Sequence, residues 1–237
     1  APPIPGLEGA GVFDSDRVFD FPGLPKSILI VGGGVIGMEF ASFYASLGTD
    51  VTVVELLDRL LPGTDREISG LVRKKLEGEG VTFRLGAKVS RVENNRVYYE
   101  YNGAQEQLEA GAVLMAVGRT PNTEGLNAQG IGLEFDRNAI KTDLCLCTNV
   151  PNIYAIGDVN GKAMLAHTAS HEGMVAVANI CGRHEEMHYD RIPSCIYLEP
   201  EIACIGLTEL WRQPENWTLQ HDGEREKPGG RGHRRPV

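Results

Sequence analysis

The sequence lacks a long apolar run and an excess of positive charge. No uninterrupted apolar stretch approaches the roughly 20 residues that cross a bilayer, so we expect no membrane-spanning helix. Residues 1–5 are proline-rich rather than basic and then apolar, which predicts no signal peptide. The formal net charge is −9, which argues against a nucleic-acid or acidic-membrane surface.

The number and spacing of the cysteines argue against a disulfide framework. The sequence has five cysteines, an odd number at irregular spacing, and this suits a reducing cytoplasm better than a disulfide framework. We interpret all five as free structural thiols: Cys145, Cys147, Cys181, Cys195 and Cys204. The composition, with 42% hydrophobic and 23% charged residues, is ordinary for a globular protein. The length of 237 residues suffices for one large or two modest domains.

The most informative feature is an apolar strand at 27–31 that runs into a G-x-G-x-x-G turn. Each glycine of this turn has a mechanical role in dinucleotide binding. Gly32 permits the tight turn, Gly34 lets a pyrophosphate approach the backbone, and Gly37 lets the helix pack closely on the sheet. The following helix presents free N–H groups and its positive dipole end to the phosphates.

An acidic residue stands where such a unit needs a ribose acceptor. Glu55 ends the next apolar strand, 18 positions after Gly37, and about 20 positions are expected. Its carboxylate accepts hydrogen bonds from the ribose hydroxyls and repels a 2′-phosphate, which favours NAD over NADP. Arg59 lies four residues on and is the one local feature that points toward NADP.

The hydrophobic pattern predicts alternating strands and helices in the first half of the chain. We expect helices at 34–47 and 65–79 and a hairpin turn at 94–95. The expected strands are 27–31, 51–55, 81–85, 88–93, 96–101 and 112–117. Two βαβ crossovers, a β-meander and a returning strand indicate an α/β, doubly wound, Rossmann-like domain.

The second half of the chain is richer in loops. We expect a strand at 152–156, a helix from His167 to about Cys181, and strands at 194–198 and 201–205. Residues 210–237 differ in composition, with six Lys/Arg against four Asp/Glu and both tryptophans. We predict that this tail is disordered.

Six consecutive motifs together resemble the FAD- and NAD-dependent disulfide reductases, and among them most of all the dihydrolipoyl dehydrogenase branch. The motifs are GGGVIGMEF, VTVVELLDRLLPG, AVGRTPN, NIYAIGDV, MLAHTASHEG and IPSCIYLEPEIACIGLTE. The resemblance covers about 3–209 and implies the following domains. Residues 1–25 end the first part of an FAD domain, 26–121 bind NAD, 122–190 are the second half of the FAD domain, and 191–209 start an α+β dimerisation domain.

The resemblance assigns cofactor contacts residue by residue. The pyrophosphate of NAD would lie on Gly32, Gly33, Gly34, Val35, Ile36, Gly37, Met38 and Glu39. Glu39 would also lie near the nicotinamide, Glu55 would bind the adenosine ribose, Val89 would touch the adenine and Gly118 would line the NAD cleft. Asp158 would hold the ribityl chain of FAD. The residues against the flavin would be Met164, Leu165, Ala166 and His167.

Three of these residues have simpler explanations from local chemistry alone. Asp158 follows a strand and a glycine, and this pair also fits an ordinary turn. Glu39 lies in the first turns of a helix, where a carboxylate favours the helix dipole without any ligand. His167 begins a helix and needs no chemical role there.

The redox centre of the family has no counterpart here. The chemistry requires a C-x4-C pair beside the flavin, and no two cysteines of this sequence are five positions apart. The first FAD-binding G-x-G-x-x-G and the C-terminal His-Glu pair are absent too. Our hypothesis is therefore an incomplete chain without catalytic residues of its own, which leaves the family pattern abruptly at Glu209 and binds NAD(H) at most.

The intact enzyme would oxidise protein-bound dihydrolipoamide through a disulfide and FAD, with hydride transfer to NAD. The resemblance implies a cytoplasmic homodimer that serves the lipoyl domains of 2-oxoacid dehydrogenase complexes, with no nucleic-acid or membrane partner. The alternatives are another disulfide reductase, of the mercuric, glutathione-like or quinone type, and a non-catalytic NAD-binding module. For the chain by itself, we expect exposed apolar surface and poor solubility.

Two histidine pairs at i, i+4 raise the question of a metal. They are His167/His171 and His184/His188. A zinc site needs a third ligand and often shows HExxH, whereas position 175 after His171-Glu172 is valine. The sequence therefore predicts no metal site.

Overall fold

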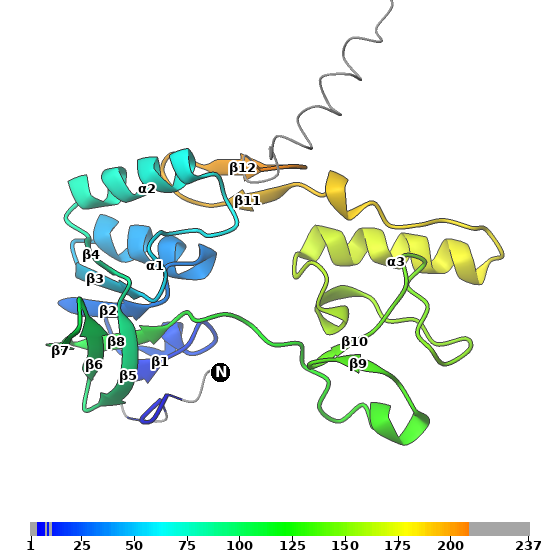
Figure 1. Ribbon diagram of the computed structural model, residues 1–237, viewed down its shortest axis with the longest axis horizontal. Helices are drawn as coiled ribbons and strands as arrows, with labels where there is room; N and C mark the ends of the chain where they lie inside the picture. The colour runs from blue at the N-terminus through cyan, green and yellow to red at the C-terminus, as the bar shows by residue number, and fades with distance from the viewer. Residues whose placement is uncertain (1–3, 8, 10, 209–237) are drawn as a thin grey trace, which may run out of the picture. The chain divides into compact units, whose positions relative to one another are not determined.

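The centre of the fold is a five-stranded parallel sheet in the order β1-β8-β2-β3-β4 (Figure 1). The computed structural model describes residues 4–7, 9 and 11–208. The strands are β1 (Val12–Phe13), β2 (Ser27–Val31), β3 (Asp50–Glu55), β4 (Thr82–Leu85) and β8 (Ala112–Met115). The sequence predicted four of them, and β1 was missed inside the segment 1–25.

The two predicted crossover helices are confirmed. Helix α1 (Val35–Ser46) joins β2 to β3, and α2 (Arg66–Gly78) joins β3 to β4. Ile28 and Ile30 of β2 lie in one buried cluster with Met38 of α1 and Leu76 of α2. The helices therefore cover one face of the sheet, as a parallel sheet requires.

The opposite face is covered by a three-stranded antiparallel sheet. Its strands are β5 (Lys88–Glu93), β6 (Arg96–Tyr101) and β7 (Ala104–Glu109). Leu29 and Val31 of β2 share a second buried cluster with Val97 and Tyr99 of β6. Because β2 is buried on both faces from Ile28 to Val31, these four residues are all apolar.

Residues 119–192 carry less regular structure. The elements are η2 (Ala128–Ile131), β9 (Phe135–Asp136), β10 (Ala139–Ile140), η3 (Gly157–Asn160), α3 (Ala166–Ile180) and η4 (Tyr189–Arg191). A small core of Leu146, Val175, Ala176 and Met187 holds α3 against the neighbouring loops.

The strand predicted at 152–156 is wrong. Only Tyr154 is paired, in an isolated bridge with Cys147. Asn152 has φ +65, which lies in the left-handed region and outside that of a β-strand. The preceding Pro151 has no N–H to contribute to a ladder.

The last described elements form a short antiparallel hairpin of β11 (Ser194–Ile196) and β12 (Ile202–Cys204). Both strands were predicted, although each is shorter than expected. The tail predicted to be disordered, 210–237, lies outside the described residues. Within 11–208, none of the helices combines the length and apolar character that crossing a bilayer demands.

Candidate nucleotide site

A cavity of about 760 Å³ opens at the carboxyl ends of the central strands. In open α/β sheets this edge is where ligands bind. Seven residues predicted to contact NAD line it: Gly32, Gly34, Val35, Ile36, Glu55, Val89 and Gly118. The fold thus brings together residues that are up to 86 positions apart in the sequence.

The glycines of the turn differ in what surrounds them. A Cβ on Gly37 would lie 2.0 Å from the carbonyl oxygen of Gly32, so the helix and the strand are too close for any side chain. Gly32 has φ +114, and its Cβ would meet the Ala116 carbonyl oxygen at 2.3 Å. A Cβ on Gly34 would meet no atom within 4 Å, although this glycine lines the cavity. The open space beside Gly34 leaves room for a close ligand.

Glu55 is fixed at the edge of the cavity by two backbone groups. Its Oε2 accepts a hydrogen bond from the Gly33 N–H, and its Oε1 accepts one from the Leu57 N–H at 2.7 Å. The carboxylate is only half-buried, so it retains acceptor capacity toward the cavity. Gly33 has little room for a side chain, because its Cβ would lie 2.8 Å from Leu60 Cδ2 and 3.0 Å from Glu55 Cγ.

Arg59 does not line this cavity. Its guanidinium donates to the carbonyl oxygens of Pro62 and Thr64, within its own loop. The arginine therefore closes the loop that follows β3, and its charge is directed to backbone carbonyls.

Two other predicted contacts lie elsewhere. Met38 is completely buried in the core, where it packs between α1 and the sheet. Glu39 accepts a hydrogen bond from the Tyr197 N–H at 2.9 Å, and it does not line the cavity. The structure thus separates these two side chains from the seven predicted NAD contacts that line the cavity; Gly33 and Gly37 do not line it either.

The residues predicted to contact FAD lie on η3 and at the start of α3. Asp158 pairs with Arg119 at 3.2 Å (Oδ2 to Nη2), and both side chains are about half exposed. Met164 lines a second cavity of about 650 Å³ together with Arg119. Leu165 precedes α3 and Ala166 begins it, without a side-chain cap.

His167 makes a backbone contact. Its Nε2 lies 2.8 Å from the carbonyl oxygen of Pro193, so this nitrogen carries the proton and donates it. The side chain thereby ties α3 to the segment that leads into β11.

Sequence reasoning missed Glu172, which is fully buried on α3. Its carboxylate accepts hydrogen bonds from the Gly157 N–H and from the Tyr189 hydroxyl, the latter at 2.7 Å. Burial, and then the hydrogen bond to Glu172, raise the pKa of Tyr189 above its usual value. Glu172 therefore positions the turn that carries Asp158. The sequence did contain a signal for Glu172: its helical spacing puts this charged residue on the same face of α3 as the buried residues Thr168, Val175 and Ala176.

Fold and cavity together define an α/β protein of the dinucleotide-binding type. Residues 1–173 match the family of pyridine nucleotide-disulphide oxidoreductases, and this chain belongs to that family. FAD and NAD are the cofactors of such enzymes.

Curated relatives include two dihydrolipoyl dehydrogenases. The enzyme of Bacillus subtilis (strain 168) is 39% identical over 209 residues, which are 87% of this chain and 46% of that protein. The enzyme of Chlamydia pneumoniae is 42% identical over 218 residues, 90% of this chain and 47% of that protein. The chain therefore spans about half the length of the curated relatives it matches.

Solved structures are similar over the same extent. The HOCl-induced flavoprotein disulfide reductase RclA from Escherichia coli has a TM-score of 0.79 and 33% identity, over 89% of this chain and 49% of that one. LpdA from Mycobacterium tuberculosis has a TM-score of 0.80 and 27% identity, over 88% of this chain and 46% of that one.

Proposed function

We propose that the 760 Å³ cavity binds NAD(H), with the pyrophosphate on the turn at 32–37 and the adenosine ribose on Glu55. The observation that carries the proposal is the convergence of Gly34, Glu55 and Gly118 on one cavity at the carboxyl ends of the central strands. The empty space beside Gly34 fits a phosphate that approaches the backbone. Val89, in the same lining, is placed to contact the adenine.

The side chains of the cavity favour NAD over NADP. Glu55 presents a carboxylate where the ribose hydroxyls would lie, and a 2′-phosphate there would be repelled. Arg59, the residue that could balance such a phosphate, is already bonded to Pro62 and Thr64.

For the whole protein we propose dihydrolipoyl dehydrogenase activity. A lipoyl dithiol is oxidised to the disulfide while NAD⁺ takes up a hydride and one proton is released. NAD supplies the hydride acceptor, and FAD supplies the electron carrier between the dithiol and NAD. In this chain Glu55 would orient the ribose of NAD, and Asp158 with Met164–His167 would hold FAD. The names of the relatives support this reading.

The domain assignment follows the same proposal: 26–121 for NAD, 122–190 for FAD and 191–209 for the start of the dimerisation domain. We further propose a cytoplasmic homodimer whose partners are the lipoyl domains of 2-oxoacid dehydrogenase complexes. All five cysteines are free thiols, which fits a reducing compartment.

A second candidate keeps the cofactors and changes the substrate. The similarity to RclA, at 33% identity and a TM-score of 0.79, supports a flavoprotein disulfide reductase that acts on a substrate other than a lipoyl group. Activity of the full-length protein toward dihydrolipoamide separates the two, since only the first candidate requires it.

Calorimetric titration of the 237-residue chain with NADH and with NADPH tests the proposed nucleotide site. We expect one site that prefers NADH by tenfold or more. Glu55→Gln should weaken NADH binding about tenfold, because a charge-assisted hydrogen bond contributes about 1.5–3 kcal/mol. The same change should reduce the preference for NADH over NADPH. Glu67→Gln, an exposed carboxylate on α2, is the matched control and should bind as the parent does. Equal affinity for both nucleotides in the parent would contradict the proposal.

A further inference from the structure

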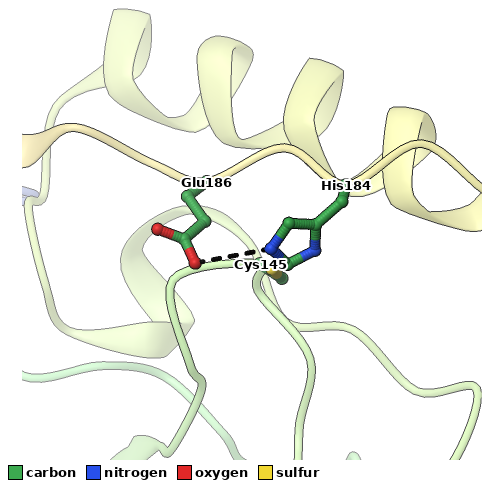
Figure 2. Close-up of side chains that lie close together, drawn as sticks. All are labelled: Cys145, His184 and Glu186. Carbon is green, nitrogen blue, oxygen red and sulfur yellow. Dashed lines mark hydrogen bonds and ion pairs between the residues drawn. The ribbon is translucent and has the colours of Figure 1, made fainter.

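Three side chains with metal-binding atoms meet outside the nucleotide cavity. The Sγ of Cys145 lies 3.8 Å from Nδ1 of His184, and Nε2 of His184 lies 3.7 Å from Oε1 of Glu186. One donor atom from each residue can be chosen so that all three lie within 4.8 Å of one another. Figure 2 shows the carboxylate of Glu186 directed toward the His184 ring, with Cys145 directly behind the ring. We call these three residues the Cys145 cluster.

From this geometry we propose that the Cys145 cluster binds a divalent metal ion of the zinc type. In a tetrahedral zinc site, bonds of about 2.3 Å to sulfur and 2.0–2.1 Å to nitrogen put the two ligand atoms about 3.6 Å apart. The 3.8 Å between Cys145 and His184 is close to that separation. A thiolate, an imidazole and a carboxylate together form a ligand set that zinc accepts.

The two segments that carry the ligands are fixed in place by the backbone. The Met187 N–H donates to the Leu144 carbonyl oxygen at 2.9 Å, which joins the residues next to Cys145 and Glu186. Leu146 and Met187 are both buried in the small core under α3. The Cys147 N–H donates to Asp143 Oδ1 at 2.9 Å and closes the loop around Cys145.

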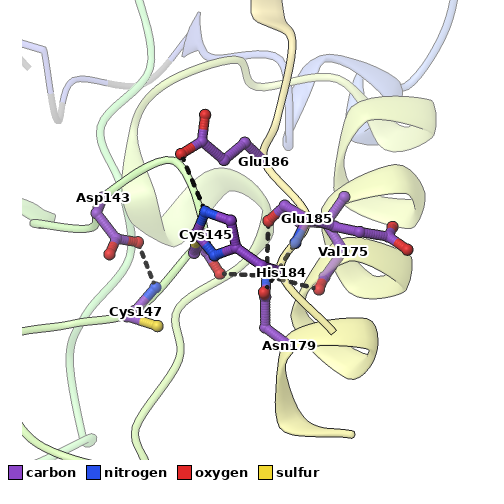
Figure 3. A network of polar contacts seen from close by, with 8 residues as sticks. All are labelled: Asp143, Cys145, Cys147, Val175, Asn179, His184, Glu185 and Glu186. Carbon is purple, nitrogen blue, oxygen red and sulfur yellow. Dashed lines mark hydrogen bonds and ion pairs between the residues drawn. The ribbon is translucent and has the colours of Figure 1, made fainter. Parts of the chain in front are cut away.

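Asn179 of α3 joins both segments to the helix. Its Nδ2 lies within hydrogen-bond distance of the carbonyl oxygens of Cys145, Val175 and Glu185, and its Oδ1 accepts from the Glu185 N–H at 3.1 Å. Figure 3 shows these contacts around the cluster. These hydrogen bonds fix the ligand-bearing backbone, so that binding a metal needs only side-chain adjustment.

The charges around the thiol favour a cation, because Asp143 and Glu186 bring negative charge to its surroundings. Lys162 is the basic neighbour, and its Nζ donates to the Asp143 carbonyl oxygen at 2.8 Å.

The site is open to solvent. The side chain of His184 is 81% exposed and that of Glu186 is 47% exposed, so water can complete the coordination. Cys145 faces Nδ1 of His184, whereas Glu186 faces Nε2. An ion bound to Sγ and Nδ1 therefore requires the exposed Glu186 side chain to turn toward it. None of the three residues lines the nucleotide cavity, so the proposal is independent of NAD binding.

Cobalt titration of the untagged, reduced and metal-stripped chain tests the proposal. We expect one equivalent of Co²⁺ to bind with a thiolate-to-cobalt charge-transfer band, and Zn²⁺ to displace it. Cys145→Ser should abolish the band. His184→Gln should weaken binding at least tenfold, and Asn179→Ala should weaken it tenfold to 100-fold by loosening the ligand segments.

The matched controls are Cys181→Ser and His171→Gln, since both side chains are exposed and outside the cluster. Both should bind cobalt as the parent does. A band that persists in Cys145→Ser, or no saturable binding by the parent, would overturn the proposal. Circular dichroism monitors folding. If Cys145→Ser does not fold, the exposed His184→Gln variant decides, and parent-like affinity there refutes the site.

Discussion

Single residues decide how closely a ligand can approach the first turn of α1. Gly32 and Gly37 lack side chains because their backbones lie against the carbonyl oxygens of Ala116 and Gly32. Gly34 lacks one for a different reason, since the space beside it holds no protein atom. The same residue type therefore serves packing at two positions and ligand access at the third.

Alanine at Gly37 and at Gly34 should separate these two roles. Gly37→Ala places a Cβ 2.0 Å from a backbone oxygen, so we expect a loss of about 1–3 kcal/mol in unfolding free energy. Gly34→Ala should leave stability nearly unchanged and weaken NADH binding at least tenfold. Urea denaturation and NADH titration measure the two effects. Equal loss of stability in both variants would contradict the assignment.

Glu172 is a second single residue on which the structure depends, because its carboxylate on α3 accepts hydrogen bonds from the Gly157 N–H and the Tyr189 hydroxyl. Because the folded state raises the pKa of Tyr189, the folded chain keeps this proton when the unfolded chain releases it. The contribution to stability is complete below the ordinary tyrosine pKa of 10.0 and is lost progressively above it.

Tyr189→Phe should therefore flatten the decline of stability above pH 10.0. Below that pH the variant should lose about 1–3 kcal/mol, because a hydrogen bond to a charged, buried carboxylate disappears. Thermal unfolding over a pH series provides the measurement. Tyr197→Phe, at a residue that is 72% exposed, is the comparison and should follow the parent. An unchanged slope in Tyr189→Phe would refute this account.

At the scale of secondary-structure elements, the strands β5, β6 and β7 depend on the residues of the turns that join them as well as on their own residues. The hairpin turn predicted at 94–95 is confirmed, with φ of +51 and +60. Asn102 and Gly103 make the next such turn, with φ of +51 and +78, between β6 and β7. Asn-Gly is a strong hairpin signal, so β7 was within reach of the sequence. Its side chains are mostly exposed and polar, and the strand therefore lacked a clear apolar pattern.

Gly103→Ala isolates the cost of the left-handed backbone. A Cβ there would meet no atom within 4 Å, so any loss comes from the positive φ alone. We expect the variant to be less stable by about 1 kcal/mol in urea denaturation. Gly70→Ala, at an equally open position inside α2, should instead gain about 0.5–1 kcal/mol. A loss of similar size in both variants would show that the turn is not the cause.

The predictions from sequence succeeded where a feature depends on the local hydrophobic pattern or on the spacing of residues close together in the chain. Strands buried on both faces read as apolar runs, and the glycine turn with Glu55 located the cavity. They failed where a contact joins distant parts of the chain. Nothing near Glu39 indicates Tyr197, which is 158 positions away, and nothing near Cys145 indicates His184, which is 39 positions away.

At the scale of the whole molecule, exposed apolar side chains lie along α3. Met174, Val177 and Ile180 are each more than half exposed and recur every three residues, so they share one side of the helix. The expectation of exposed apolar surface thus has a specific location among the described residues. Such a stripe favours association with another surface.

Lysine on this stripe should reduce self-association of the chain. We expect the double variant Met174→Lys, Ile180→Lys to sediment as a smaller species than the parent at equal concentration. Leu71→Lys, at an exposed apolar residue of α2, should behave as the parent does. If the parent is already a clean monomer at high concentration, or if the double variant associates equally, the stripe has no such role.

The most direct test of the central claim is an experimental structure of this chain with NAD bound. The account predicts the pyrophosphate against Gly34 and the adenosine ribose within hydrogen-bond distance of Glu55, inside the 760 Å³ cavity. A nucleotide bound elsewhere, for example in the cavity lined by Arg119 and Met164, would contradict it.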